Sequence, residues 1–479
     1  MNKGEGAYDV VVIGGGTAGL VTAAGVAGLG GRAALIEKGK MGGDCLNTGC
    51  VPSKALISSA RLVEHIRQAE KWGLLPQEPK FQLEAVMARM RERRSKIAPH
   101  DSQARFESLG VDVFRGHAKF ISAGEVRVGD ATLRARSFVI ATGSRPAIPP
   151  LDGLDRVTHY TNETIFDDLK GKPQHMVVLG GGPIGCELGQ AFARLGVEVT
   201  LLQTGARLLP REDPDASELL LRRLESEGIN VLTGAKARVA ARHGHTIRVW
   251  ADVEGEDSRH PIDCDAILVA AGRRPNVEEL GLEEAGVAFT EKGITVDEHL
   301  QTSRKNIYAA GDVTGTHLFT HVADSHARTI VRNILVPWVK AKREDEVIPW
   351  CTYTSPEVAR VGLNETEAEK KGIPFEVWKQ PLSDLDRAVV ESEEEGFAKV
   401  LTRKGTDWIL GATIVAERAG DLIHEFVLAM KAEVGLKTIS GTIHAYPTYA
   451  EIARKLADAQ QKSRLTPFAK RVLRWRWGR

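Results

Sequence analysis

The stretch that decides the fold is Tyr8–Gly39, YDVVVIGGGTAGLVTAAGVAGLGGRAALIEKG. It begins with an apolar run that is typical of a buried parallel strand. Three glycines follow in the spacing GxGxxG (Gly14, Gly16 and Gly19), before a small-residue helix pattern and a second strand that ends on Glu37. In this strand–turn–helix–strand context, the glycines predict a pyrophosphate at the helix N-terminus and the acid predicts a bond to a ribose hydroxyl.

A second copy of the pattern lies at His175–Gly205, HMVVLGGGPIGCELGQAFARLGVEVTLLQTG. Gly180, Gly182 and Gly185 repeat the glycine spacing, but Gln203 stands where the acid would be. Two dinucleotide sites in one chain predict two cofactors that exchange hydride.

The composition is that of an ordinary globular protein. The chain has 479 residues, a net charge of +1 and 42% apolar residues, which predicts two to four domains and no global attraction to nucleic acid or membranes. The N-terminus carries no secretory signal pattern, and no apolar run reads as a membrane span. Five cysteines are too few for a disulfide scaffold and favour a reducing compartment, so we expect a cytoplasmic protein.

Two of the cysteines, Cys45 and Cys50, lie in Gly42–Lys54, GGDCLNTGCVPSK. A helical pattern with Pro52 near its start places Cys50 at a helix N-terminus. In one regular helix the two Cα atoms would be roughly 8–9 Å apart, whereas a disulfide needs less than about 7 Å. We therefore expect Leu46–Gly49 to be irregular.

Three interpretations of this cysteine pair are open. A metal site would need further Cys or His ligands at ligand spacing, and none accompanies the pair. A structural disulfide is unusual in a reducing compartment. A redox pair is favoured because the positive end of the helix dipole stabilises the thiolate of Cys50.

Taken together, the motifs resemble those of the flavin-dependent pyridine nucleotide–disulfide oxidoreductases, which include dihydrolipoamide dehydrogenase, glutathione reductase and mercuric reductase. The likeness extends from about Tyr8 to about Ala457. It rests on GGGTAG, GGDCLNTGCVPSK, ATGSRP, GGGPIGCE, AAGRRPN, YAAGD, TSPEVARVGL and HAYPTYAE, in family order.

The resemblance implies an α/β fold with two Rossmann-like dinucleotide-binding domains and a C-terminal α+β dimerisation domain, assembled as a homodimer. We expect an FAD-binding domain in two parts, an inserted NAD(P)-binding domain, an interface domain and a basic tail. The expected bounds are 1–150 and 275–345 for the two parts of the FAD-binding domain and 151–274 for the NAD(P)-binding domain. The interface domain is expected at 346–460 and the basic tail at 461–479.

The resemblance also implies FAD at the first fingerprint and NAD(P)H at the second. Gln203 does not repel a 2′-phosphate, and Arg207 is near it in sequence, which favours NADPH slightly. The predicted cofactor-binding residues are Gly14, Gly16, Gly19, Glu37, Lys38, Gly43, Thr142, Gly143, Gly180, Gly182, Gly185, Gln203, Gly272 and Asp312.

For catalysis, the resemblance implies that Cys50 faces the flavin as a thiolate and that Cys45 meets the substrate. Lys54 and Glu187 match the ion pair that the family places near the flavin. No resident metal is expected.

The C-terminal motif departs from the family's His-Pro-Thr pattern. In IHAYPTYAE, Tyr446 replaces the histidine that serves the partner's interchange thiol, and Glu451 keeps the spacing of the acid that orients it. A phenol with a pKa of about 10 shuttles a thiol proton poorly. His444 lies two residues earlier, as in dihydrolipoamide dehydrogenases, where it is not the acid–base residue. Mercuric reductases have tyrosine here, but they end in a cysteine pair, whereas no cysteine follows Cys351.

We predict an enzyme that passes electrons from NAD(P)H through FAD and the cysteine pair to a small-molecule substrate, either a small disulfide such as a lipoyl group or a thiophilic metal ion. The alternatives are a quinone-reducing diaphorase and an electron-transfer subunit of a larger redox complex. In the basic tail, Leu465, Phe468, Val472 and Trp475 share one helical face. A basic amphipathic helix of this kind can contact a membrane surface or a protein partner, but packing on the chain itself or a frayed end is the favoured interpretation.

Overall fold

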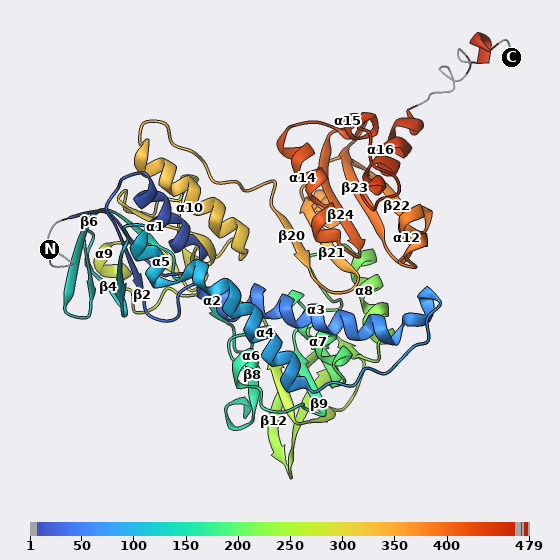
Figure 1. Ribbon diagram of the computed structural model, residues 1–479, viewed down its shortest axis with the longest axis horizontal. Helices are drawn as coiled ribbons and strands as arrows, with labels where there is room; N and C mark the ends of the chain where they lie inside the picture. Colours follow the sequence, from blue (N-terminus) through green and yellow to red (C-terminus); the bar gives the residue numbers. More distant parts are fainter. Residues whose placement is uncertain (1–6, 465–470, 472–473, 478–479) are drawn as a thin grey trace.

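The computed structural model describes residues 7–464, 471 and 474–477. It has three lobes, joined across the middle by the long helices α3 (Cys50–Arg67) and α4 (Leu83–Ile97) (Figure 1). No helix among the described residues is both long and apolar enough to cross a membrane.

The first lobe is built on a seven-stranded sheet with the order β3-β2-β1-β6-β5-β4, in which β19 also pairs with β6. Helices α1 (Thr17–Gly28) and α10 (Thr320–Leu335) pack against each other beside it. Near residue 310 the chain thereby returns to the same sheet that contains its first strand, β1. The strands are β1 (Tyr8–Ile13), β2 (Ala33–Glu37), β3 (Asp112–Arg115), β4 (Ala118–Ser122), β5 (Glu125–Val128), β6 (Ala131–Ile140) and β19 (Ile307–Ala309).

The second lobe repeats this plan around the second fingerprint. Its parallel sheet has the order β11-β10-β9-β15-β8, with α7 (Pro183–Arg194) and α8 (Pro214–Ser226) beside it and a separate antiparallel sheet of β12, β13 and β14. The strands are β8 (His159–Thr161), β9 (His175–Leu179), β10 (Glu198–Gln203), β11 (Asn230–Thr233), β12 (Ala235–His243), β13 (Thr246–Val253), β14 (His260–Cys264) and β15 (Ala266–Val269).

The chain enters and leaves the second lobe through two short strands that pair with each other. These strands, β7 (Ser144–Pro146) and β16 (Arg273–Pro275), are antiparallel, with Arg145 opposite Arg274. The second lobe is therefore an insertion that both starts and ends at the edge of the first.

The third lobe contains an antiparallel sheet with the order β20-β21-β24-β23-β22 and helices on its faces. Its main elements are β20 (Pro349–Thr352), β21 (Glu357–Gly362), β22 (Phe375–Pro381), α12 (Asp386–Val390), β23 (Phe397–Arg403), β24 (Ile409–Ala416), α14 (His424–Lys431), α15 (Leu436–Gly441) and α16 (Glu451–Ser463). Of the predicted tail face, Leu465, Phe468 and Val472 lie outside the described residues, and Trp475 is exposed.

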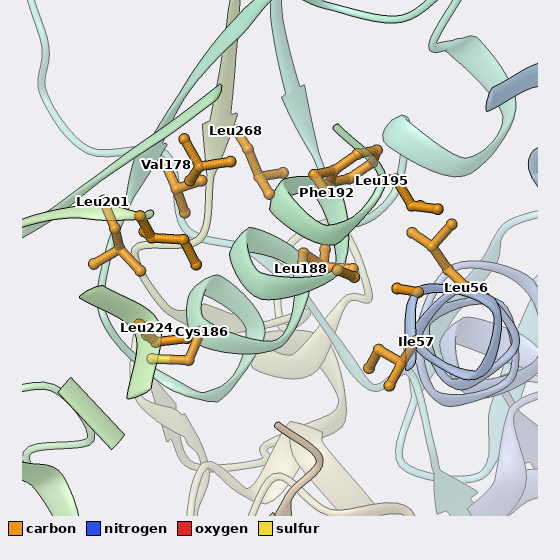
Figure 2. Packing of buried hydrophobic residues seen from close by; sticks show 14 of the residues in the cluster. Leu56, Ile57, Val178, Cys186, Leu188, Phe192, Leu195, Leu201, Leu224 and Leu268 are labelled. Carbon is orange, nitrogen blue, oxygen red and sulfur yellow. The ribbon is translucent and has the colours of Figure 1, made fainter. Parts of the chain in front are cut away.

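The helix that follows the cysteines packs on the helix that follows the second fingerprint. Figure 2 shows Leu56 and Ile57 of α3 facing Leu188 of α7 and Leu195, which directly follows α7, in one buried cluster. Each fully buried leucine contributes about 1.5–3 kcal/mol through removal of its surface from water. This packing fixes the first turn of α3 relative to α7, where two predicted site residues, Lys54 and Glu187, meet.

Candidate functional site

A single cavity of about 1370 Å³ runs between the lobes and brings most of the predicted residues together. Cys45, Cys50, Lys54 and Glu187 line it between the two fingerprints. The predicted cofactor-binding residues that line it are Gly14, Gly16, Glu37, Lys38, Gly43, Thr142, Gly143, Gly180, Gly182, Gln203, Gly272 and Asp312.

The remaining two fingerprint glycines, Gly19 and Gly185, allow the helix to pack closely against the end of the preceding strand. A Cβ atom at either position would lie 1.8 Å from the carbonyl oxygen of the first glycine of its own fingerprint, Gly14 or Gly180. Only glycine allows this approach, so both residues shape the turns from behind the cavity wall.

The first fingerprint is suited to hold the pyrophosphate of a dinucleotide. Helix α1 starts at Thr17, and no side chain caps its N-terminus, so its first backbone N–H groups are available to an anion at the cavity wall. The Glu37 carboxylate accepts hydrogen bonds of 2.5 Å from the backbone N–H groups of Gly15 and Gly39. This places the acid at the end of β2, where a ribose hydroxyl would reach it.

The second fingerprint has the same geometry without the acid. Oε1 of the buried Gln203 accepts a 2.9 Å hydrogen bond from the backbone N–H of Gly181. Two basic side chains, Arg211 and Lys236, also line the cavity, and the Arg211 guanidinium lies 4.8 Å from the centre of the Trp350 ring of the third lobe. Arg207, which the sequence pointed to, is not among the described residues that line it.

Asp312 lies at the junction of the first and second lobes. Its Oδ2 accepts a 2.6 Å hydrogen bond from Ser144 Oγ and lies 3.7 Å from Arg273 Nε. Burial raises the pKa of Asp312 despite these partners. A buried carboxylate on the cavity wall is suited to bind a polyhydroxyl chain, such as the one in a flavin.

The cysteines occupy two helices separated by a two-residue break. Cys45 lies in α2 (Gly43–Asn47), and Cys50 is the first residue of α3. The expectation that Leu46–Gly49 is irregular is therefore wrong at Leu46 and Asn47, which are helical, and the break falls at Thr48 and Gly49.

Local hydrogen bonds explain this short helix. The Asn47 amide donates to the carbonyl oxygens of Met41 and Gly43 at 2.9 and 2.8 Å, and the Thr48 hydroxyl donates to Asp44 Oδ1 at 2.6 Å. Such local side-chain bonds stabilise one helical turn and then end it.

The two cysteines are free thiols with opposite electrostatic tendencies. The Cys45 thiol donates a hydrogen bond to the Cys50 sulfur, which raises the pKa of Cys45 and lowers that of Cys50. The hydroxyl of Thr320, 3.5 Å from Cys50 Sγ, and the charge of Lys54 lower the pKa of Cys50 further. These contacts favour the thiolate at Cys50 and the protonated thiol at Cys45.

Lys54 and Glu187 form an ion pair across the α3–α7 contact. Lys54 Nζ donates to Glu187 Oε2 at 2.8 Å, and Glu187 Oε1 accepts a 2.9 Å hydrogen bond from the backbone N–H of Tyr353. The ammonium also lies 4.4 Å from the centre of the Tyr353 ring. Burial alone would lower the pKa of Lys54, but the Glu187 carboxylate holds it above its ordinary value.

Tyr446 and Glu451 are not among the described residues that line the cavity. The exposed Tyr446 hydroxyl donates to Asp386 Oδ2 at 2.9 Å. Glu451 is buried and accepts instead from Arg454 at 2.7 Å. One chain therefore lacks the C-terminal part of the predicted site.

His444 is also already paired, since its Nε2 lies 2.9 Å from Glu425 Oε1. Of the other cysteines, Cys186 and Cys264 are buried, whereas Cys351 is half-buried and lines the cavity. The described residues contain no group of three or more His, Cys, Asp or Glu side chains that could hold a metal ion.

Sequence reasoning missed Thr320, Tyr353 and Asp386. Each contacts a predicted site residue across 60 to 299 positions of the chain (Thr320 to Cys50, Tyr353 to Lys54, Asp386 to Tyr446). None of the three lies in a chemical motif of its own, and only the fold brings them to their partners.

Comparison with known proteins agrees with this geometry. Residues 8–329 match the family described as pyridine nucleotide-disulphide oxidoreductase, and residues 348–457 match its dimerisation domain. The second match supports the expected homodimer.

The chain is similar to relatives that are named for different substrates. A mercuric reductase of Staphylococcus aureus is 35% identical over 457 residues, covering 93% of this chain and 81% of the relative. A dihydrolipoyl dehydrogenase of Thermus scotoductus is 37% identical over 462 residues, covering 95% and 98%.

Among solved structures, the HOCl-induced flavoprotein disulfide reductase RclA from Escherichia coli has a TM-score of 0.84 and 28% identity, covering 94% of this chain and 99% of RclA. The two glycine-rich turns, the cysteine pair and these matches over 93–95% of the chain lead to one conclusion: the chain belongs to the pyridine nucleotide-disulphide oxidoreductase family and is a flavin-dependent oxidoreductase.

Proposed function

We propose that this chain takes electrons from NADPH through bound FAD and delivers them at Cys45 to a thiophilic metal ion as substrate. Bound FAD would supply the transfer of an electron pair from the nicotinamide to the cysteine pair. Gly14, Gly16, Glu37 and Asp312 would hold it, since they line the cavity at the first fingerprint.

The observation that carries the choice of acceptor is the state of Tyr446. Reduction of a disulfide requires a proton for the departing thiolate, which a histidine can supply near neutral pH. The Tyr446 hydroxyl is bonded to Asp386, which raises the pKa of the phenol above its ordinary value. A metal ion that binds sulfur has no leaving thiol and needs no such donor.

Two similar proteins support a metal acceptor. One is the mercuric reductase of Staphylococcus aureus, and the other is RclA, of which a Cu(II) complex has been solved. An electron pair would reduce one two-electron acceptor such as Hg(II) or two one-electron acceptors such as Cu(II). A lipoyl-type disulfide is the second candidate, favoured by the similarity to dihydrolipoyl dehydrogenases over nearly the whole chain.

The deciding experiment is anaerobic titration with NADPH, followed by turnover with Cu(II), Hg(II), lipoamide and glutathione disulfide. We expect a long-wavelength thiolate-to-flavin absorption band that Cys50→Ser abolishes, and faster turnover with the metal ions than with the disulfides. Tyr446→His should raise disulfide turnover. Faster reduction of lipoamide than of either metal ion by the wild type would contradict the metal assignment.

For the nicotinamide, we propose NADPH because the uncharged Gln203 does not repel a 2′-phosphate and the basic Lys236 lines the same cavity. Gln203→Glu should keep the hydrogen bond to Gly181, since Glu37 makes the equivalent bond to Gly15. The added charge would repel a 2′-phosphate, so we expect the KM for NADPH to rise on the order of tenfold while the KM for NADH does not. Equal changes for both nucleotides would contradict the assignment.

A further inference from the structure

The loop that carries Tyr446 is fixed to α12 of the same chain. Tyr446 Oη donates to Asp386 Oδ2 at 2.9 Å, and Arg387 Nη1 donates to the carbonyl oxygen of Pro447 at 3.4 Å. Lys455 Nζ, from α16, lies 3.6 Å from Asp386 Oδ1. These contacts hold the phenol in one direction although 71% of Tyr446 is exposed.

Glu451, which the family pattern assigns as the orienting acid, is bonded to another residue and not to Tyr446. It is 2% exposed, its Oε1 accepts from Arg454 Nη2 at 2.7 Å, and its Oε2 has no hydrogen-bond partner among the described residues. The carboxylate that contacts the phenol therefore belongs to α12 and not to α16.

We propose that Asp386 is the positioning residue and proton acceptor for Tyr446 when Cys45 of the partner subunit captures a metal ion. The inference rests on the proposed function and on the family pattern, in which the residue at the position of Tyr446 serves the interchange thiol of the neighbouring chain. Because the phenol O–H points at Asp386, the lone pairs of Oη are left to face the incoming thiol. Tyr446 thus accepts a hydrogen bond from the thiol and does not donate one.

The step balances in protons and charge. The S–H bond of the thiol breaks, a sulfur–metal bond forms, and the thiol proton moves to Tyr446 Oη while the phenol proton moves to Asp386. Asp386, whose side chain is 54% exposed, then releases the proton to water. No electron moves in this step, and the phenol is never required to become a phenolate.

The surrounding charges fit this direction of transfer. The hydrogen bond to Asp386, the charge of Asp386 and the more distant Glu451 hold the pKa of Tyr446 above its ordinary value. The cations near the pair are Lys455, on Asp386, and Arg387, on the loop carbonyl. A phenol kept protonated in this way can pass a proton on only if its own proton leaves at the same time.

The test compares Asp386→Asn with the matched control Asp384→Asn. The Asp384 carboxylate accepts from Gln380 Nε2 at 2.8 Å on the same segment, and no contact joins its side chain to Tyr446. Each variant is titrated by ultraviolet difference spectroscopy, with Tyr446→Phe identifying the signal of Tyr446. NADPH-reduced enzyme is then mixed with Cu(II), and the rate of reoxidation is followed against pH.

We expect Asp386→Asn to lower the titration midpoint of Tyr446 and to slow reoxidation by Cu(II) on the order of tenfold, as loss of a group that orients a ligand does. Reduction by NADPH should be unchanged, Asp386→Glu should restore part of the rate, and Asp384→Asn should behave as wild type.

Two outcomes overturn the assignment of Asp386: an unchanged Tyr446 titration in Asp386→Asn, or equal slowing in Asp384→Asn. Both are separable from failure of the proposed function, which would appear in the wild-type protein as absence of the thiolate-to-flavin band or as faster turnover with lipoamide than with either metal ion. The titration of Tyr446 is read without turnover, so it tests the contact independently of the acceptor.

Discussion

At the residue scale, the immediate neighbours of the two cysteines determine which one is stabilised as a thiolate and which one is kept protonated. Cys50 is stabilised as a thiolate by Cys45, Thr320 and Lys54, and the hydrogen bond that it accepts keeps Cys45 protonated. The helix N-terminus acts in the same direction, because α3 begins at Cys50. This asymmetry supports the prediction, made from the family resemblance, that Cys50 faces the flavin and Cys45 the substrate.

Thr320 offers a direct test of this asymmetry. Its hydroxyl lies 3.5 Å from Cys50 Sγ and favours the charged form, so its removal raises the pKa of Cys50 from about 6. We expect Thr320→Val to move the midpoint of the thiolate-to-flavin band upward by roughly one pH unit. Thr320→Ser, which keeps the hydroxyl, should leave the midpoint in place. A midpoint that shifts equally in both variants would show that the hydroxyl is not responsible.

The sequence predicted residues that belong to motifs and missed those that do not. The fingerprint glycines and Glu37 follow a fixed spacing, so their place in the cavity could be expected. Thr320 contacts Cys50 across 270 positions of the chain, and no local pattern encodes such a pairing. Arg207 was singled out by closeness in sequence, but the loop after β10 brings Arg211 to the cavity wall instead.

At the element scale, α3 and α7 form the frame on which the site is built. Each helix follows a site motif, and their apolar faces pack together in the cluster of Figure 2. The hydrophobic periods predicted both helices, but the contact between them joins segments more than 100 residues apart. The Lys54–Glu187 ion pair is a consequence of that contact, which is why only a family resemblance could suggest it.

The ion pair should behave as a partly buried pair. Lys54→Met leaves the Glu187 carboxylate, 6% exposed, without its cation. We expect a loss of about 2 kcal/mol, below the roughly 3–5 kcal/mol of a fully buried pair, because 35% of the Lys54 side chain is exposed. The double variant Lys54→Met/Glu187→Leu should recover most of this loss. Thermal unfolding of the wild type, the single variants Lys54→Met and Glu187→Leu, and the double variant measures the coupling, and additive losses would contradict it.

At the scale of the whole molecule, one chain holds only part of the predicted site. Cys45 and Cys50 lie on the wall of the central cavity, whereas Tyr446 lies on the third lobe, outside the described cavity lining. Around Tyr446, the third lobe exposes apolar side chains, among them Ile443 (98%) and Leu428 (69%). Such a surface is typical of an interface. It belongs to residues 348–457, the segment that matches the dimerisation domain.

A mixed dimer tests whether Tyr446 completes the site of the other chain. When a Cys45→Ser chain is paired with a Tyr446→Phe chain, one site carries both substitutions and the other carries neither. If Tyr446 acts across the interface, the purified heterodimer regains about half of the wild-type rate of metal reduction, although both parent homodimers are impaired. Complementation of this kind follows from the two-fold symmetry of a homodimer, in which each surface contributes to both sites.

The alternative geometry gives a different result in the same experiment. If Tyr446 served the cysteines of its own chain, every site in the heterodimer would carry one substitution, and its rate would not exceed the mean of the two homodimers. Differently tagged chains, co-expressed and purified by both tags, provide the heterodimer, and reduction of its flavin by NADPH is the internal control. Neither substitution removes a residue at the two fingerprints, so NADPH should reduce the flavin in all dimers. A lower rate of metal reduction then reports on the cysteine–tyrosine pairing alone.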